Sequence, residues 1–533
     1  MRGLMMDEYP LTLTAVAQRA ERFHPERAIV TRRPGGEVER TDYATALGRA
    51  RRLAAGLRGL GIEQGERVAT LLWNQAEHLE LYFAVPCSGA VLHTLNPRLH
   101  PHELAYIAAH AGDRAIVVDE TLLEILEGFR ASSGIEHVIV VSHGKPAPEG
   151  AIAYEDLVAG AEPLAWPELD ERSAAAMCYT SGTTGRPKGV AYSHRSSVLH
   201  ALAVGLPDAL GVSSRDAVLP VVPMFHANAW GLPYAAALAG AALVLPGPHL
   251  DAESVLGLLS SERVTMTAGV PTVWMSMLAA LDAEPDRWDL GALSTLVVGG
   301  AAVPESLLRG FDAHGLRVVQ AWGMTETSPL GTVCHPLGPG EERTDDERYS
   351  YRARQGIAVP LVEIRARDDD GELVGWDDSS LGELEIRGPW VAAAYHGGEG
   401  AEKFTGDGWF QTGDIVTIDG RGCLRIRDRA KDLVKSGGEW ISSVELENLL
   451  MAHPAVTEAA VIAVPDERWG ERPLAVVVFA GGQRPTDEAL REHLARDFAR
   501  WQLPERFEVV DAIPRTATGK WRKTELRERF AGA

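Results

Sequence analysis

Cysteine is scarce in this chain, and long apolar runs are lacking. Its four cysteines among 533 residues are Cys87, Cys178, Cys334 and Cys423, without the paired spacing of disulfide frameworks or zinc sites. We therefore expect free thiols and a cytoplasmic protein. The sequence contains no run of about 18 uninterrupted apolar residues, and its first ten residues lack a signal-type apolar segment. Neither an integral membrane segment nor a secretory signal is expected.

Basic charge is also in deficit. Lysine and arginine number 52 against 74 acidic residues, which gives a formal net charge of -22. Nucleic acids and strongly anionic membranes are bound by basic faces, so we expect no nucleic-acid partner. A peripheral contact with a bilayer stays compatible with this charge. The apolar share of 45% is typical of a globular protein.

Helical periodicity alternates with short β-rich runs up to residue 330, which predicts layered parallel sheets with helices. The predicted helices include 43–60, 101–111, 230–239 and 252–261, and the predicted strands include 137–141, 242–245 and 264–267. Runs at 362–366, 381–386, 415–418 and 424–427 are punctuated by Gly, Pro and Asp, which favours antiparallel β structure.

A cluster of charges at 427–432 then precedes a segment with its own β and α alternation. The predicted fold class is α/β: a large N-terminal domain of layered sheets with helices and a β-rich subdomain, plus a small mobile α+β C-terminal domain. The predicted domains are 1–427 and 433–533, joined by a hinge at 428–432, and the second has a plausible size for its own core.

A phosphate cradle is predicted between two strands, at Tyr179 to Gly189, which reads YTSGTTGRPKG. Its glycines allow a close backbone approach to an anion, and its hydroxyls and two cations can bind phosphate oxygens. The spacing is neither that of a Walker A loop nor that of a dinucleotide fingerprint. A binding site for a nucleotide triphosphate explains this combination of residues better than a plain polar surface turn does.

A second motif, Ala321 to Thr327, reads AWGMTET and places a carboxylate beside hydroxyls. Glu326, with Thr325, is a candidate magnesium ligand, because Mg²⁺ prefers one or two carboxylates together with phosphate oxygens. Taken alone, a Thr-Glu-Thr run is more often a solvated turn or a helix cap than a metal site.

Six motifs in a fixed order resemble the adenylate-forming acyl-CoA synthetase superfamily, in particular its medium- and long-chain fatty acid CoA ligases. They are the cradle, GGAA at 299–302, GMTE at 323–326, QTGD at 411–414, Asp428-Arg429 and PRTATGK at 514–520. The resemblance covers nearly the whole chain. It implies ATP, Mg²⁺ and coenzyme A as cofactors and a small-molecule carboxylic acid as substrate.

The resemblance also implies a role for each matching residue. It assigns ATP to Thr180, Ser181, Gly182, Thr183, Thr184, Lys188, Gly300, Ala301, Ala302, Trp322, Gly323, Asp414 and Arg429. Within this set, Asp414 and Arg429 would hold the ribose, and Trp322, where many relatives have tyrosine, would stack on adenine. Lys520 would bridge the substrate carboxylate and the α-phosphate, where an ammonium stabilises developing negative charge.

For thioester formation, the resemblance implies that the small domain rotates about Lys431. The segment that would then face coenzyme A contains Lys435, Gly437, Gly438 and Trp440, and its glycines would let pantetheine pass close to the backbone. A plain hairpin turn at the two glycines is compatible with the same residues.

The resemblance also implies that the acid lies beside His226, which it assigns to the catalytic centre, and beside Trp230, which would gate an acyl tunnel near Gly323. Small and apolar neighbours favour an elongated apolar acid, so we predict a medium- or long-chain fatty acid. The alternatives are an aryl, short or thioether-containing acid, a carrier protein as acceptor, or an inactive nucleotide-binding module that acts through an interface. Family resemblance further suggests a homodimer.

Overall fold

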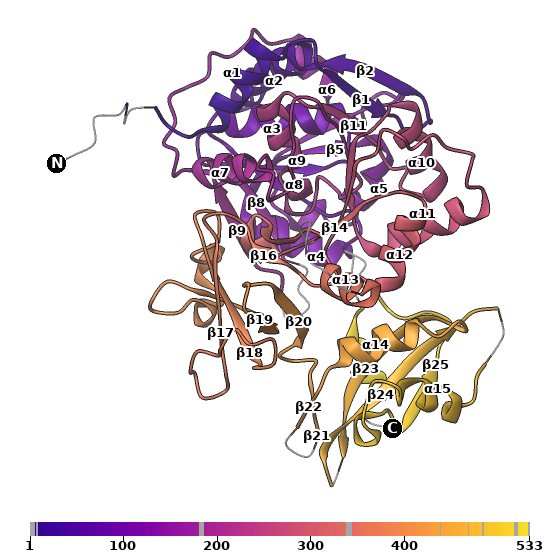
Figure 1. The fold of residues 1–533 in the computed structure, drawn as a ribbon. Helices are drawn as coiled ribbons and strands as arrows, with labels where there is room; N and C mark the ends of the chain where they lie inside the picture. The colour runs from indigo at the N-terminus through magenta and orange to yellow at the C-terminus, as the bar shows by residue number, and fades with distance from the viewer. Residues whose placement is uncertain are drawn as a thin grey trace.

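The computed structural model describes residues 6, 9–180, 186–336, 344–436, 439–466, 468–481, 484–515 and 521–530, with only the backbone at Glu439. Within these residues the strands form sheets of nine, seven, four and five strands. Figure 1 shows the two larger sheets with their helices in one large body and the five-stranded sheet in a separate smaller one. The predicted fold class is confirmed, while the hinge at 428–432 stays a prediction.

The seven-stranded sheet carries the cradle at one edge, in the order β7-β6-β5-β3-β4-β8-β9. All neighbours are parallel except β8 and β9, which pair antiparallel. Its strands are β3 (Arg67–Leu71), β4 (Val91–Thr94), β5 (Asp113–Asp119), β6 (His137–Val141), β7 (Ile152–Ala153), β8 (Ala174–Tyr179) and β9 (Gly189–Ser193). The central strands are nearly continuous apolar runs because helices cover both faces.

The nine-stranded sheet has the order β16-β15-β14-β13-β12-β10-β11-β1-β2 and a parallel centre. Its strands are β1 (Ala28–Arg32), β2 (Val38–Asp42), β10 (Ala217–Pro220), β11 (Ala242–Leu245), β12 (Met266–Gly269), β13 (Thr295–Val298), β14 (Val318–Gly323), β15 (Leu330–Cys334) and β16 (Ile357–Ala358). Adjacent strands β12, β13 and β14 end side by side, and ligands bind at such carboxyl ends in open α/β sheets.

The helices form three apolar layers on these sheets. One core cluster fills the space between the two sheets around α3 and α9, and two others lie on the outer faces beneath α10 to α12 and beneath α4 and α5. The bounds are α1 (Leu13–Phe23), α2 (Tyr43–Gly59), α3 (Ala76–Cys87), α4 (Pro101–Ala111), α5 (Leu123–Glu127), α6 (Tyr154–Ala159), α7 (His194–Val204), α8 (Ala227–Trp230), α9 (Leu232–Ala239), α10 (Ala252–Ser261), α11 (Pro271–Ala283), α12 (Glu305–Ala313) and α13 (Asp345–Arg352). Across the described residues, no helix has both the length and the apolar character needed to span a membrane.

Two predicted elements are corrected by the structure. The predicted strand 264–267 is β12, Met266–Gly269. The predicted helix 230–239 begins only at Leu232, because Ala227 to Trp230 all have positive φ, between 43° and 57°. These residues form a left-handed turn, which L-residues adopt at a cost of roughly 1–2 kcal/mol each, so α8 does not continue into α9.

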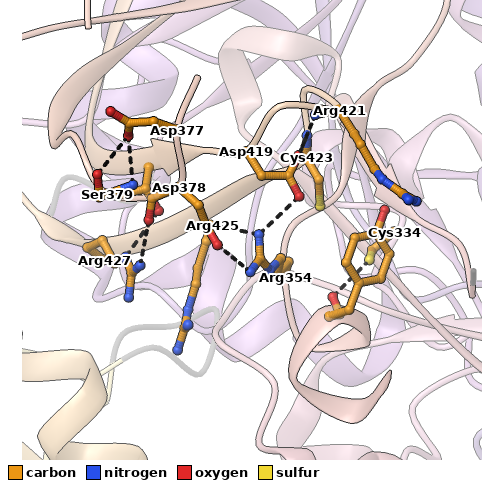
Figure 2. Close-up of polar contacts among 12 residues, drawn as sticks. Cys334, Arg354, Asp377, Asp378, Ser379, Asp419, Arg421, Cys423, Arg425 and Arg427 are labelled. Carbon is orange, nitrogen blue, oxygen red and sulfur yellow. Dashed lines mark hydrogen bonds and ion pairs between the residues drawn. The ribbon is translucent and has the colours of Figure 1, made fainter. Parts of the chain in front are cut away.

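The predicted antiparallel β subdomain is confirmed as the sheet β17 (Glu363–Arg367), β18 (Gly382–Arg387), β19 (Phe410–Ile418) and β20 (Leu424–Arg429). Arg354, which follows α13, ties two loops of this subdomain to the large domain. Figure 2 shows its guanidinium between Asp378, at 2.7 Å, and Asp419, at 3.2 Å. All four cysteines of the chain are buried free thiols, as predicted.

The smaller body is built on the order β22-β21-β24-β23, with β25 parallel to β24. Its elements are β21 (Val434–Ser436), β22 (Glu439–Ile441), α14 (Ser443–Met451), β23 (Val456–Asp466), β24 (Gly470–Phe479), α15 (Asp487–Leu494), β25 (Arg506–Val509) and α16 (Lys523–Phe530). Separate apolar clusters cover the two faces of this sheet. A buried ion pair, Lys523 Nζ to Glu447 Oε1 at 2.6 Å, joins α16 to α14, and burial raises the pKa of Glu447 to about 7.

Candidate active site

The base of the cradle is closed by two hydrogen bonds between its ends. The Thr180 N–H donates to the Lys188 carbonyl at 2.9 Å, and the Lys188 N–H donates to Thr180 Oγ1 at 3.1 Å. These bonds extend the β8–β9 ladder by one pair and fix where the loop leaves the sheet. The predicted phosphate ligands Ser181, Gly182, Thr183 and Thr184 lie outside the described residues.

The candidate magnesium ligand Glu326 lies beside the cradle. It belongs to the short 3-10 turn Thr325–Thr327 and is only 6% exposed. The Tyr395 hydroxyl donates to Glu326 Oε1 at 2.5 Å, and the Tyr192 hydroxyl from β9 donates to the Thr325 carbonyl at 2.7 Å. The structure therefore brings β9, which follows the cradle, next to the turn that contains Thr325 and Glu326, as the sequence predicts.

Lys188 completes this cluster. Its Nζ lies 5.0 Å from the centroid of the Tyr395 ring, within the range of a cation–π contact. Burial and the nearby Glu326 carboxylate raise the pKa of Tyr395 above its usual range. Tyr395 was not predicted from the sequence, and no motif pointed to it, because its contact with Glu326 spans 69 residues of chain.

The tight turn after β14 requires glycine at Gly323. A Cβ built there would lie 1.4 Å from the Pro329 carbonyl oxygen, so no other side chain fits without rebuilding the turn. The Thr327 hydroxyl accepts the Met324 N–H at 2.9 Å and stabilises the same turn. Gly323 thus acts on the geometry of Thr325 and Glu326, whereas its predicted nucleotide and acyl contacts stay predictions.

The predicted adenine site lies at the ends of β13 and β14. Ala301 and Ala302 are exposed, and Gly300 has a positive φ of 83°. The Trp322 ring packs over Gly331, whose added Cβ would lie 2.7 Å from Cζ3, and the residue is 9% exposed. Most of this residue's surface is therefore buried, and its predicted stacking on adenine stays a prediction.

The two predicted ribose ligands face each other across neighbouring strands. Asp414 on β19 and Arg429 on β20 are register partners, and Arg429 Nε lies 2.8 Å from Asp414 Oδ1. Asp414 is 1% exposed, and an Arg429 Nη1–H also donates to the Thr412 carbonyl at 3.2 Å. A carboxylate held this way can accept hydrogen bonds from a vicinal diol.

Of the predicted acyl-binding residues, Trp230 ends the left-handed turn, His226 directly precedes this turn, and Gly323 lies at the end of β14. The Cys178 thiol on β8 donates to Asn228 Oδ1 at 3.2 Å and anchors the left-handed turn. The Trp230 ring lies against Gly299, where an added Cβ would be 3.0 Å from Cη2. A small pocket of about 20 Å³ next to the cradle is lined by Thr94, Leu95, Asn96, Leu99, Ile107, Tyr179, Thr180, Phe225 and His226. His226 and Thr180 therefore share one pocket.

The small body presents Lys435 and Trp440 on paired strands. Lys435 Nζ lies 3.9 Å from the Trp440 ring centroid and 3.7 Å from Asp369 Oδ2 of the β17–β18 connection. Figure 1 shows β21 and β22 at the far end of the small body, away from the large sheets. Gly437, Gly438 and the adenylation lysine Lys520 lie outside the described residues, so their predicted roles stay predictions.

Lys431 lies in the turn between the two bodies. This turn starts at Arg429, whose carbonyl accepts the N–H groups of Asp432 at 2.9 Å and Leu433 at 3.0 Å. Desolvation lowers the pKa of Lys431. In the part of the chain that the structure describes, no group of three or more His, Cys, Asp or Glu side chains could hold a metal ion, so a magnesium ion would depend on Glu326 together with phosphate oxygens.

Comparisons with known proteins identify the family of this chain. The AMP-binding enzyme family matches residues 16–396, and the AMP-binding enzyme C-terminal domain matches residues 445–520. The structure resembles that of the anthranilate CoA ligase AuaEII in complex with anthranoyl-AMP, with a TM-score of 0.86, 26% identity and 99% of each chain covered.

Full-length relatives are also named CoA ligases. A long-chain fatty acid CoA ligase of Thermus thermophilus is 49% identical, with 99% of this chain and 96% of the relative covered. A 3-methylmercaptopropionyl-CoA ligase of Ruegeria pomeroyi is 45% identical (99% and 99%), and a medium-chain fatty acid CoA ligase of Ectopseudomonas oleovorans is 44% identical (99% and 98%). These matches confirm the predicted enzyme class, an AMP-forming acyl-CoA synthetase. The chain belongs to the AMP-binding enzyme family.

Proposed function

We propose that this protein is an ATP- and Mg²⁺-dependent ligase that joins a medium- or long-chain fatty acid to coenzyme A through an acyl-adenylate. The observation that carries the proposal is the convergence of Lys188 from the cradle and Glu326 from the turn after β14 on one tyrosine, Tyr395. The Lys188 ammonium, which can bind phosphate, and the Glu326 carboxylate, which can bind a metal ion, thereby lie close together where the two large sheets meet.

The residues present fit magnesium. Glu326 and Thr325 offer a carboxylate and a hydroxyl, which are the oxygen donors that Mg²⁺ prefers. Magnesium bound there would neutralise charge on the phosphates of ATP. Lys188 would contact the same phosphates from the cradle, and the buried Asp414 would orient the nucleotide through its ribose.

Adenylation brings a carboxylate against the α-phosphate, so two anions meet. Lys520 would lower this repulsion from the small domain. After pyrophosphate leaves, a rotation about Lys431 would remove Lys520 and present Lys435 and Trp440 to the thiol of coenzyme A. The family match at both ends of the chain supports the presence of the parts that this sequence of steps needs.

The identity of the acid is proposed from the named relatives and from the left-handed turn that ends at Trp230. Two of the relatives named above act on long-chain and medium-chain fatty acids by name. Trp230, half-buried against Gly299, would be displaced by an acyl chain that enters beside the nucleotide. A second candidate acid is a short thioether acid, because a relative of nearly equal identity is named for 3-methylmercaptopropionate.

Coenzyme A as acceptor, a cytoplasmic location, peripheral membrane contact and a homodimer belong to the same proposal. An assay of AMP release with and without coenzyme A, across short, aryl, thioether, medium and long acids, tests acid and acceptor together. The expected result is CoA-dependent AMP release with a maximum for medium or long acids. A maximum for 3-methylmercaptopropionate would favour the second candidate, and no AMP from any acid would refute the ligase.

A further inference from the structure

Tyr395 lies in the connection between β18 and β19, directly before the 3-10 turn His396–Gly398. It is 7% exposed. Its ring packs edge-on against Phe404 and Phe410, with centroids 5.4 and 6.4 Å away. These contacts leave the ring little freedom to turn, so the direction of its hydroxyl is set by the four-stranded subdomain.

The same ring separates two opposite charges. Its hydroxyl donates to Glu326 Oε1 at 2.5 Å, and its face lies 5.0 Å from Lys188 Nζ. A tyrosine hydroxyl that faces an ionised carboxylate is the donor of the pair, because the carboxylate has no proton to give. The ionised carboxylate has further lone pairs on both oxygens, so Glu326 would still be able to hold a metal ion.

Gly400 shapes the space for the ammonium. It has a positive φ of 64°, and a Cβ added there would lie 2.7 Å from Lys188 Nζ and 3.1 Å from the Tyr395 ring. The backbone of Gly400 and the ring of Tyr395 therefore bound the ammonium on two sides. A side chain at this position would press on Nζ first and on the Tyr395 ring as well.

We propose that Tyr395 is a positioning residue for adenylation, which holds Glu326 by its hydroxyl and Lys188 by its ring face. Without the ring between them, direct attraction between the ammonium and the carboxylate would compete with phosphate for Lys188 and with a metal ion for Glu326. The tyrosine keeps them close but separate. The inference rests on the proposed ATP and magnesium roles of the two residues.

Binding of Mn²⁺ tests this role apart from catalysis. Titrations followed by electron paramagnetic resonance, with a non-hydrolysable ATP analogue present, compare the wild type with Tyr395→Phe. Loss of one hydrogen bond to a charged group predicts a rise of about 10-fold or more in half-saturating Mn²⁺. Affinity for the analogue at saturating metal should stay within about 3-fold, because the phenyl ring still bounds Lys188.

Two further variants separate positioning from general stability. Tyr154→Phe is a matched control, since the Tyr154 hydroxyl donates to the buried carboxylate of Glu80 at 2.6 Å, outside the candidate site. It should leave half-saturating Mn²⁺ unchanged. Gly400→Ala should weaken binding of the analogue, because the added methyl group would displace the Lys188 ammonium.

An unchanged Mn²⁺ titration in Tyr395→Phe, or an equal shift in Tyr154→Phe, would overturn the role of Tyr395. If the wild type released no AMP with any acid, the proposed function would fail instead. The Mn²⁺ comparison would still decide whether Tyr395 orients Glu326, so the two failures are distinguishable.

Discussion

Replacement of Asp414 by asparagine should cost the enzyme its recognition of ribose. The carboxylate is 1% exposed and lies 2.8 Å from Arg429 Nε, so its position is fixed by the strand pair that carries both residues. Asparagine has the same shape but offers a neutral amide. The variant therefore changes charge and acceptor strength without opening a cavity.

A hydrogen bond to a charged group contributes about 1.5–3 kcal/mol, which corresponds to about 10- to 150-fold in affinity. We expect the KM for ATP, measured by ATP–pyrophosphate exchange, to rise by a factor in this range in Asp414→Asn. The wild type should discriminate against 2′-deoxy-ATP or 3′-deoxy-ATP by about the same factor. In the variant this discrimination should fall to about 3-fold or less, because the asparagine amide already accepts a weaker hydrogen bond from the ribose hydroxyl than the carboxylate does.

The matched control is Asp378→Asn, which weakens an ion pair of the same kind, from Asp378 to Arg354 at 2.7 Å (Figure 2). This variant should keep full discrimination between ATP and its deoxy analogues. If Asp414→Asn discriminated as strongly as the wild type, Asp414 would not bind the ribose, whatever its effect on KM.

Three further predictions follow from the structure. Trp230→Ala should raise kcat/KM for longer-chain acids by about 10-fold. An unchanged dependence of kcat/KM on chain length would exclude a gating role for Trp230. Lys520→Ala should lower acyl-adenylate formation by about 100-fold or more yet spare thioester formation from preformed adenylate, which single-turnover assays separate. Burial lowers the pKa of His194 to about 4, below its unfolded value, so its stabilisation is present above about pH 6.5 and is lost as the pH falls toward 4. The variant His194→Asn keeps an acceptor for the Leu13 N–H. Between pH 7.5 and pH 5, urea unfolding should show that this variant loses about 2 kcal/mol less free energy of unfolding than the wild type. Equal losses would contradict a neutral buried histidine.

Elements with local signals could be predicted from the sequence. Helix α4 has the predicted bounds, Pro101–Ala111, because Pro101 suits a first turn and Gly112 ends it in the left-handed region. The strand at 137–141 is likewise a short apolar run with clear ends. The four-stranded subdomain was predictable as antiparallel because its runs are short and separated by turn residues.

The rest depends on contacts that a local pattern does not contain. Alanine at 227 and 229 has high helix propensity, so the left-handed turn contradicts every local preference and is held instead by partners such as Cys178. The predicted site residues Asp414 and Arg429 do meet, whereas Tyr395 escaped prediction because a tyrosine between two charges has no sequence signature.

The contact between the two bodies includes a buried carboxylate and an ion pair. The Asp428 carboxylate is fully buried and accepts the Ser443 N–H of α14 at 2.6 Å, yet burial raises its pKa. The desolvation cost of this charge thus exceeds what its hydrogen bonds and the nearby Lys523 return, and water would recover that cost once α14 moved away. Arg427, which ion-pairs with Glu445 of α14 at 2.6 Å, is half-buried and would be re-solvated in the same way. The rotation about Lys431 that the family resemblance implies would expose both side chains to water, and their hydration would offset part of the free energy of the lost contacts.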